Sequence, residues 1–113
     1  MTTTNYVLIG GRKTINPKDV ILLEADENYT QIHFVNGAKI TVATTLKRLE
    51  ERFSGCIEFF RTHKSYLINL NYIKQINNLG GEVHVKMRND YKVTISRRKK
   101  CAFCDRLSAI GLN

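Results

Sequence analysis

The chain has 113 residues, 42% of them hydrophobic and 25% charged, with 18 Lys and Arg against 10 Asp and Glu. These values are typical of a globular domain and exclude a disordered chain, and no apolar run is long enough to cross a bilayer. The sequence shows neither a disulfide framework nor a basic leader. We therefore expect a single domain over residues 1–113, located in the cytoplasm, with reduced thiols.

The positive charge is distributed unevenly. The formal net charge is +8, and residues 57–113 hold 11 of the 18 basic side chains but only 4 of the 10 acidic ones. A concentrated excess of this kind is the expected footprint of a polyanionic partner, which leaves nucleic acid, an anionic membrane surface or an acidic protein. Excess charge that merely aids solubility is the alternative, and the clustering of the cations argues against it.

The first 43 residues are predicted to be β-structure. Apolar residues on both sides of Gly10-Gly11 indicate a first hairpin, and the run 20–25 (VILLEA) indicates a buried strand. The clearest element is a second hairpin, because two alternating runs flank Asn36-Gly37, the strongest short hairpin signal.

The period of the apolar residues then changes from strand to helix. Leu46, Leu49 and Phe53 have helical spacing, which predicts a short amphipathic helix over about residues 45–53. Thr45 is a suitable N-cap for this helix. We expect the helix to cover one face of a sheet.

The stretch 59–69, FFRTHKSYLIN, places polar and basic side chains inside an apolar segment. Its candidate ligand-binding residues are Arg61, His63, Lys64 and Ser65, because cations, hydroxyls and imidazoles bind phosphate oxygens and base edges. The alternative is a solvated turn whose side chains bond to the backbone. We favour that turn-organising role for His63, and we weigh the ligand role at least equally for Arg61 and Lys64.

The remaining chain is predicted to be β-structure followed by one helix. Residues 66–78 are expected to be extended, and a hairpin is expected around Asn89-Asp90. A last helix is predicted over about 97–108, capped by Ser96, with an apolar face made of Phe103, Leu107 and Ile110. The chain is therefore expected to be mainly β, with small antiparallel sheets of short strands and two short helices.

Four consecutive cations, Arg97, Arg98, Lys99 and Lys100, stand at the start of this last helix. The helix dipole favours acidic residues there, so a phosphate backbone would offset an unfavourable placement. Consecutive residues on a helix cannot all point the same way. We expect Arg97 and then Arg98 to face a ligand, with Lys99 and Lys100 adding to the general field; the alternative is a solvated basic face.

A weaker candidate lies at residues 24–31, EADENYTQ. Asn28, Tyr29 and Thr30 carry groups that hydrogen-bond to phosphates or base edges. The neighbouring Asp26 and Glu27 would repel DNA unless they shape the turn and lie behind it. Taken alone, this segment therefore indicates little.

Cys101 and Cys104 form a CxxC pair, which is found in zinc and redox sites. A second ligand pair at zinc spacing is absent, and a thioredoxin-like βαβ context is missing. We interpret both residues as buried or half-buried helix thiols, and we expect no metal and no cofactor. The sequence also lacks a Gly-rich phosphate loop, an HExxH motif and a nucleophile elbow, so we expect neither enzymatic activity nor a small-molecule substrate.

Taken together and in order, four segments resemble the LytTR DNA-binding domain of bacterial transcription and response regulators. The third segment in chain order, FFRTHKSYLINLNYIKQI, is the most specific. It is close to the family pattern of aromatic, Arg, any residue, His, any residue, Ser, Tyr, two apolar residues and Asn. The similarity spans essentially the whole chain and leaves no room for a receiver domain. The segments are VILLEADENYTQIHF, TTLKRLEERF, FFRTHKSYLINLNYIKQI and VTISRRKK.

The resemblance implies a fold of roughly stacked antiparallel sheets in which loops enter successive major grooves of double-stranded DNA. It assigns contacts to the positions of Asn28, Tyr29 and Thr30, to Lys64, and to Arg97. We therefore expect a sequence-specific transcription regulator, or the C-terminal domain of one, with two copies on tandem or repeated elements. The alternatives are a protein-docking regulatory module and a non-specific nucleic-acid binder of the same fold.

Overall fold

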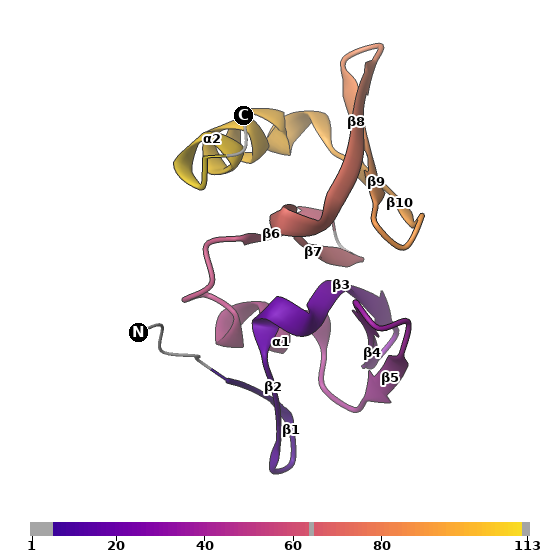
Figure 1. Ribbon diagram of the computed structural model, residues 1–113, viewed down its shortest axis with the longest axis vertical. Coiled ribbons are helices and arrows are strands. Elements are labelled where there is room, and N and C mark those ends of the chain that lie inside the picture. Colours follow the sequence, from indigo (N-terminus) through magenta and orange to yellow (C-terminus); the bar gives the residue numbers. More distant parts are fainter. Residues whose placement is uncertain (1–5, 64, 112–113) are drawn as a thin grey trace.

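The computed structural model describes residues 6–63 and 65–111, except for the side chain of His63, and within them it forms three antiparallel sheets (Figure 1). The two-stranded sheet pairs β1 (Val7–Gly10) with β2 (Lys13–Ile15). The five-stranded sheet has the order β5 (Lys39–Val42), β4 (Tyr29–Phe34), β3 (Val20–Asp26), β7 (Tyr66–Asn69) and β6 (Phe59–His63). The three-stranded sheet has the order β10 (Lys92–Ile95), β9 (Glu82–Met87) and β8 (Ile73–Leu79).

The helices complete three stacked layers. α1 (Leu46–Arg52) packs with the β1–β2 hairpin on one face of the five-stranded sheet, called the lower face. α2 (Lys100–Ala109) packs with the three-stranded sheet on the opposite, upper face, at the top of the molecule in Figure 1. Three short 3-10 turns precede β3, β8 and α2, namely η1 (Pro17–Asp19), η2 (Leu70–Tyr72) and η3 (Arg97–Lys99). The mainly β fold predicted from the sequence is confirmed.

The five-stranded sheet separates two hydrophobic cores, one on each face. Neighbouring residues of a strand point to opposite faces, so each pair of adjacent apolar residues serves both cores. The upper core takes Leu22, Phe60 and Ile68, and the lower core takes Leu23, Phe59 and Leu67. All six side chains are buried, so Phe59, Phe60, Leu67 and Ile68 anchor the polar stretch between them.

The elements predicted from local signals in the first half are present. Gly37 has a φ of 90° in the turn after β4, where the Asn36 side chain accepts a hydrogen bond from the Ala38 N–H at 2.9 Å. Thr45 caps α1, since its hydroxyl accepts from the Arg48 N–H at 3.3 Å.

Two segments differ from their predictions. The predicted extended run 66–78 is broken by η2, because the buried Asn69 accepts a hydrogen bond from the Asn71 N–H while its amide donates to the Val20 carbonyl. The predicted helix 97–108 opens with η3, and α2 itself begins at Lys100. Ser96 precedes η3 but makes no capping hydrogen bond with its side chain.

Within the described residues, no helix combines the length and apolar character needed to cross a bilayer.

Candidate nucleic-acid interface

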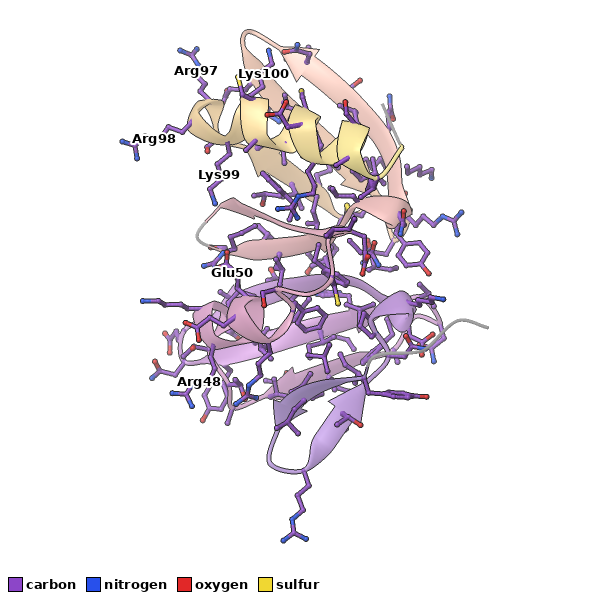
Figure 2. All side chains as sticks on the ribbon, turned by 90° about the vertical axis from the view of Figure 1, so that its left-hand side faces the viewer. Arg48, Glu50, Arg97, Arg98, Lys99 and Lys100 are labelled. Atoms are coloured by element: carbon purple, nitrogen blue, oxygen red, sulfur yellow. The ribbon has the colours of Figure 1, made fainter. Side chains whose placement is uncertain are left out.

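The cationic segment from Arg97 to Lys100 presents its side chains in different directions. Arg97 and Arg98 are exposed and extend away from the ribbon, whereas Lys99 points down toward the central sheet (Figure 2). The Arg97 guanidinium donates to the Gly80 carbonyl at 3.2 Å, which holds it near the β8–β9 turn. As expected for consecutive residues, only part of this segment faces outward. Arg97 and Arg98 do so, whereas Lys99 is half-buried and turned inward.

The polar stretch around residue 61 is more regular than the sequence suggests. Arg61 and Thr62 lie on β6 rather than in an exposed turn, and Thr62 is completely buried. The turn is short because β7 already begins at Tyr66. Lys64 and the side chain of His63 fall outside the described residues, so the structure places neither of these candidate contacts.

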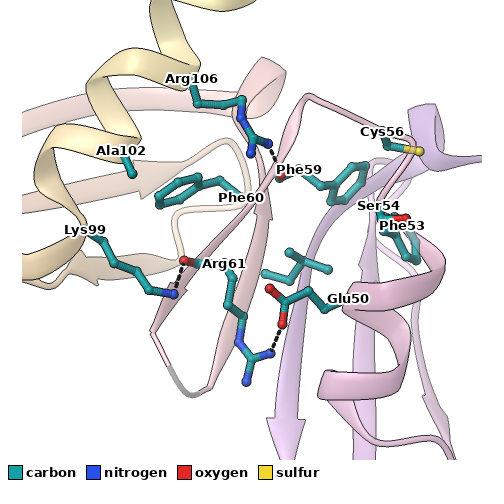
Figure 3. A pocket seen from close by; sticks show the side chains of 11 residues that line it. Glu50, Phe53, Ser54, Cys56, Phe59, Phe60, Arg61, Lys99, Ala102 and Arg106 are labelled. Atoms are coloured by element: carbon teal, nitrogen blue, oxygen red, sulfur yellow. Dashed lines mark hydrogen bonds and ion pairs between the residues drawn. The ribbon is translucent and has the colours of Figure 1, made fainter.

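Arg61 is committed to an internal ion pair. Its guanidinium lies 2.7 Å from a carboxylate oxygen of Glu50 on α1, and its side chain is only 18% exposed (Figure 3). The Arg61 side chain thus links β6 to α1, and the DNA contact expected at Arg61 stays a prediction. Ser65 is half-buried, and its carbonyl accepts from the Ala25 N–H at 2.8 Å.

The β3–β4 turn exposes two of its three candidate residues. Asn28 is exposed, and Tyr29 is 51% exposed. Thr30 is completely buried, and its hydroxyl donates to the Thr44 carbonyl at 2.6 Å. Alternation along β4 turns the Thr30 side chain into the protein interior, and the DNA contact expected at this residue stays a prediction.

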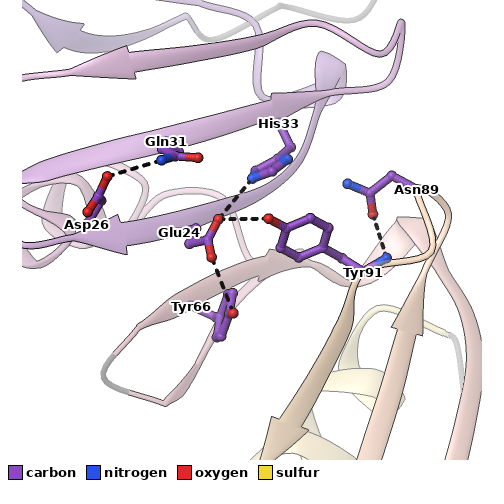
Figure 4. Close-up of polar contacts among 7 residues, drawn as sticks. All are labelled: Glu24, Asp26, Gln31, His33, Tyr66, Asn89 and Tyr91. Carbon is purple, nitrogen blue, oxygen red and sulfur yellow. Dashed lines mark hydrogen bonds and ion pairs between the residues drawn. The ribbon is translucent and has the colours of Figure 1, made fainter.

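A half-buried carboxylate on β3 links this hairpin to its neighbours. Glu24 on β3 accepts hydrogen bonds from the Tyr91 hydroxyl at 3.0 Å and the Tyr66 hydroxyl at 3.4 Å, and it lies 3.3 Å from the His33 ring (Figure 4). Burial and the nearby Glu24 raise the pKa of both tyrosines. Burial lowers the pKa of His33, and the contact with Glu24 opposes that shift only in part. Glu24 thereby links the five-stranded sheet to the β9–β10 turn.

Two hydrogen bonds bring the three candidate segments together. The bond from the Ala25 N–H to the Ser65 carbonyl places the β3–β4 hairpin beside the β6–β7 turn. The ammonium group of Lys99 donates to the Arg61 carbonyl at 2.8 Å, which places η3 beside β6. Segments that are about 35 residues apart in the sequence therefore form one continuous surface with Asn28, Tyr29, Arg97 and Arg98 exposed.

A cleft of about 400 Å³ lies behind this surface, between α1, β6 and α2 (Figure 3). Its floor is aromatic and already largely covered, since Phe53, Phe59 and Phe60 are each less than 10% exposed. Its rim carries Glu50 and three cations, Arg61, Lys99 and Arg106. Each of these four side chains makes a hydrogen bond or an ion pair inside the protein.

The cysteines of the CxxC pair are more accessible than predicted. Cys101 and Cys104 are both free and exposed, because Phe103 and Leu107 take the buried face of α2. The interpretation as buried or half-buried thiols is therefore wrong. The residues that the structure describes contain no group of three or more His, Cys, Asp or Glu side chains arranged to hold a metal ion.

Two residues of this region escaped sequence reasoning. Glu24 lies within a run of strand residues, and Arg106 lies within the predicted last helix, so neither position stands out in the sequence. A signal for Arg106 exists in its spacing, because Lys99, Phe103 and Arg106 recur at intervals of four and three and therefore share one helical face. For Glu24 no local signal exists, since its partners lie up to 67 residues away.

Comparison with known proteins identifies the class of this fold and surface as a DNA-binding domain. The family model of the LytTr DNA-binding domain matches residues 10–108, and the chain belongs to this family. The chain is 37% identical over 62 residues to the sensory transduction protein LytT of Oceanobacillus iheyensis. This aligned stretch covers 55% of the chain and 25% of that protein. The chain therefore spans about a quarter of the length of that relative.

A solved structure shares the fold. The LytTr DNA-binding domain of a response regulator from Bacillus cereus superposes with a TM-score of 0.71 at 21% sequence identity. The match covers 95% of this chain and 98% of that one. The stacked-sheet architecture is thus retained although most of the residues differ.

Proposed function

We propose that this domain binds double-stranded DNA sequence-specifically as part of a transcription regulator, with its turns reading the major groove. The observation that carries the proposal is the continuous surface on which the β3–β4 turn, the β6–β7 turn and η3 meet. Asn28 and Tyr29 offer hydrogen-bonding groups, and Arg97 and Arg98 offer exposed cations. Such groups bind base edges and phosphates. The family resemblance adds Lys64 as a third point of contact.

The rigid support of these turns favours specific recognition over loose attachment. The turns follow strands whose apolar residues are buried, and hydrogen bonds tie the turns to one another. A contact surface that is already ordered loses less conformational entropy on binding. A single domain reads only a short element, and each mismatched base pair costs only about 1–3 kcal/mol. We therefore include two copies on tandem elements spaced by whole helical turns in the proposal.

Selection from random duplex DNA, followed by titration of the enriched sequence at several salt concentrations, tests this function. We expect one enriched motif, and an affinity that falls steeply as salt rises because bound phosphates release counterions. A steep salt dependence without an enriched motif would identify a non-specific binder. Absence of both would leave the protein-docking alternative, whose interface would respond only mildly to salt.

Glu27 gives a further prediction within this surface. It occupies the first position of the two-residue turn between β3 and β4 with a φ of 57°, where glycine is preferred. Glu27→Gly should relieve backbone strain, raising the free energy of unfolding by up to about 1 kcal/mol after the entropy cost of glycine. It should also strengthen DNA binding by removing a negative charge.

The matched control Glu27→Gln separates these two effects. It removes the charge but keeps the left-handed backbone, so affinity should rise while the free energy of unfolding stays at the parent value. Urea unfolding and DNA titration of all three proteins provide the measurements. Weaker DNA binding by Glu27→Gln would show that Glu27 does not face DNA in the proposed way.

A further inference from the structure

The open edge of the five-stranded sheet is covered by two cations, one from η3 and one from α2. β6 is an outer strand of that sheet, so alternate carbonyls on its free side lack a strand partner. Lys99 donates to the Arg61 carbonyl at 2.8 Å, and Arg106 donates to the Phe59 carbonyl at 2.9 Å (Figure 3). Arg106 also donates to the Ile57 carbonyl at 2.9 Å. The two side chains thus supply hydrogen-bond donors where a neighbouring strand would otherwise do so.

The spacing of these cations fits the edge they cover. Lys99 and Arg106 are seven residues apart, which is about two helical turns, so they lie on one face. Phe103 lies between them on that face, and its ring contacts the Phe60 ring at a centroid distance of 5.6 Å. The Arg106 guanidinium also lies 5.8 Å from the centre of the Phe60 ring. The apolar contact holds the middle of α2 on the sheet, and the two cations fix its orientation along β6.

We propose that Lys99 is a positioning residue for DNA recognition rather than a phosphate contact. Its bond to β6 fixes the start of the helix, which carries Arg97 and Arg98, relative to the β6–β7 turn. The inference rests on the proposed DNA-binding function and deepens it. Lys99 differs in this respect from Arg98, which extends outward and makes no hydrogen bond or ion pair within the described residues.

The bond at Lys99 matters because η3 has little other support. Ser96 gives no side-chain cap, and Arg97, Arg98 and Lys99 are not part of the buried core. Apart from the backbone hydrogen bonds of η3, from the Lys99 N–H to the Ser96 carbonyl and from the Lys100 N–H to the Arg97 carbonyl, the side-chain bond that would remain is the exposed one from Arg97 to the Gly80 carbonyl. The residues of η3 would then become ordered only when DNA binds. The entropy lost in ordering them lowers the affinity for DNA, although no contact with DNA is removed.

The test compares Lys99→Met with Lys99→Arg and with Lys100→Met on the selected DNA sequence. Lys99→Met keeps the apolar stem but removes the donor, and it should weaken binding roughly three- to tenfold, the cost of ordering a few side chains. The slope of log affinity against log salt should stay at the parent value, because no phosphate contact is lost. Lys99→Arg should restore binding. Lys100→Met removes the same charge and should have a smaller effect.

A double-mutant cycle with Arg97→Ala distinguishes positioning from an independent contribution. If Lys99 acts through the helix start, Lys99→Met should cost less affinity when Arg97 is already absent. Additive losses, together with a salt slope reduced by about one, would make Lys99 a phosphate contact and overturn the inference. Lower melting temperature with unchanged DNA affinity would also overturn it.

Hydrogen–deuterium exchange of the free protein tests the same inference without DNA. Lys99→Met should raise deuterium uptake in residues 96–100 and in β6, and Lys100→Met should not. Unchanged uptake would overturn the positioning role. If Lys99→Met shows this local loosening but the parent protein binds no duplex DNA, the proposed function fails while the bond between the helix and the sheet edge stands.

Discussion

Replacement of Phe103 by alanine is expected to destabilise the domain by about 3–5 kcal/mol, the usual cost of removing a buried aromatic side chain. Phe103 is 1% exposed, and its ring packs against Phe60 on the upper face of the five-stranded sheet. α2 has only ten residues, too few for a helix to be stable in water by itself. Its attachment therefore depends on this contact, together with Leu107 and Ile110.

Urea unfolding of Phe103→Ala, Phe103→Leu and the control Cys104→Ala measures this effect. Cys104 is an exposed neighbour on the same helix, so its replacement should leave the free energy of unfolding within about 0.5 kcal/mol of the parent. Phe103→Leu keeps much of the apolar volume and should fall between the other two proteins. A loss below about 1 kcal/mol for Phe103→Ala would mean that α2 is not held by this core.

Local sequence signals predicted the hairpins and α1 because the interactions that specify them are local. Asn36-Gly37 specifies a turn through backbone conformation, and Thr45 caps a helix through a bond three residues away. The family resemblance supplied the stacked arrangement of the sheets, which no local pattern indicates. The pairing of β3 with β7, for example, joins strands that are more than 40 residues apart.

The candidate interface was harder to predict, because neighbouring polar residues look alike in a sequence. Thr30 stands next to Tyr29, yet strand alternation exposes Tyr29 and buries Thr30. Lys99 stands next to Arg98, yet the helix turns its ammonium group toward the Arg61 carbonyl. Such distinctions depend on where each strand and helix begins, and a shift of one residue reverses them. Element boundaries therefore decide which candidates face outward.

The double substitution Arg97→Ala with Arg98→Ala is expected to cause the largest loss of DNA affinity. Each exposed arginine that contacts a base or phosphate contributes about 1–3 kcal/mol, so the pair should weaken specific binding roughly a hundredfold or more. Stability should change little, since both side chains are exposed and only Arg97 donates an internal hydrogen bond, to Gly80. Titration of the selected DNA at two salt concentrations, with a melting curve for each protein, measures both quantities.

Arg12→Ala with Lys13→Ala is the matched control, because it removes the same charge at the β1–β2 turn, far from α2 (Figure 1). If binding depends on specific contacts, the control should lose only a small, salt-sensitive part of the affinity. Equal losses in the two double variants would mean that the overall field of the domain, rather than the surface at η3, attracts DNA. The single variants then separate the roles of the two residues. If Arg97 contacts a base, Arg97→Ala should relax the sequence preference at one position. If Arg98 contacts a phosphate, Arg98→Ala should reduce the salt slope by about one at every sequence.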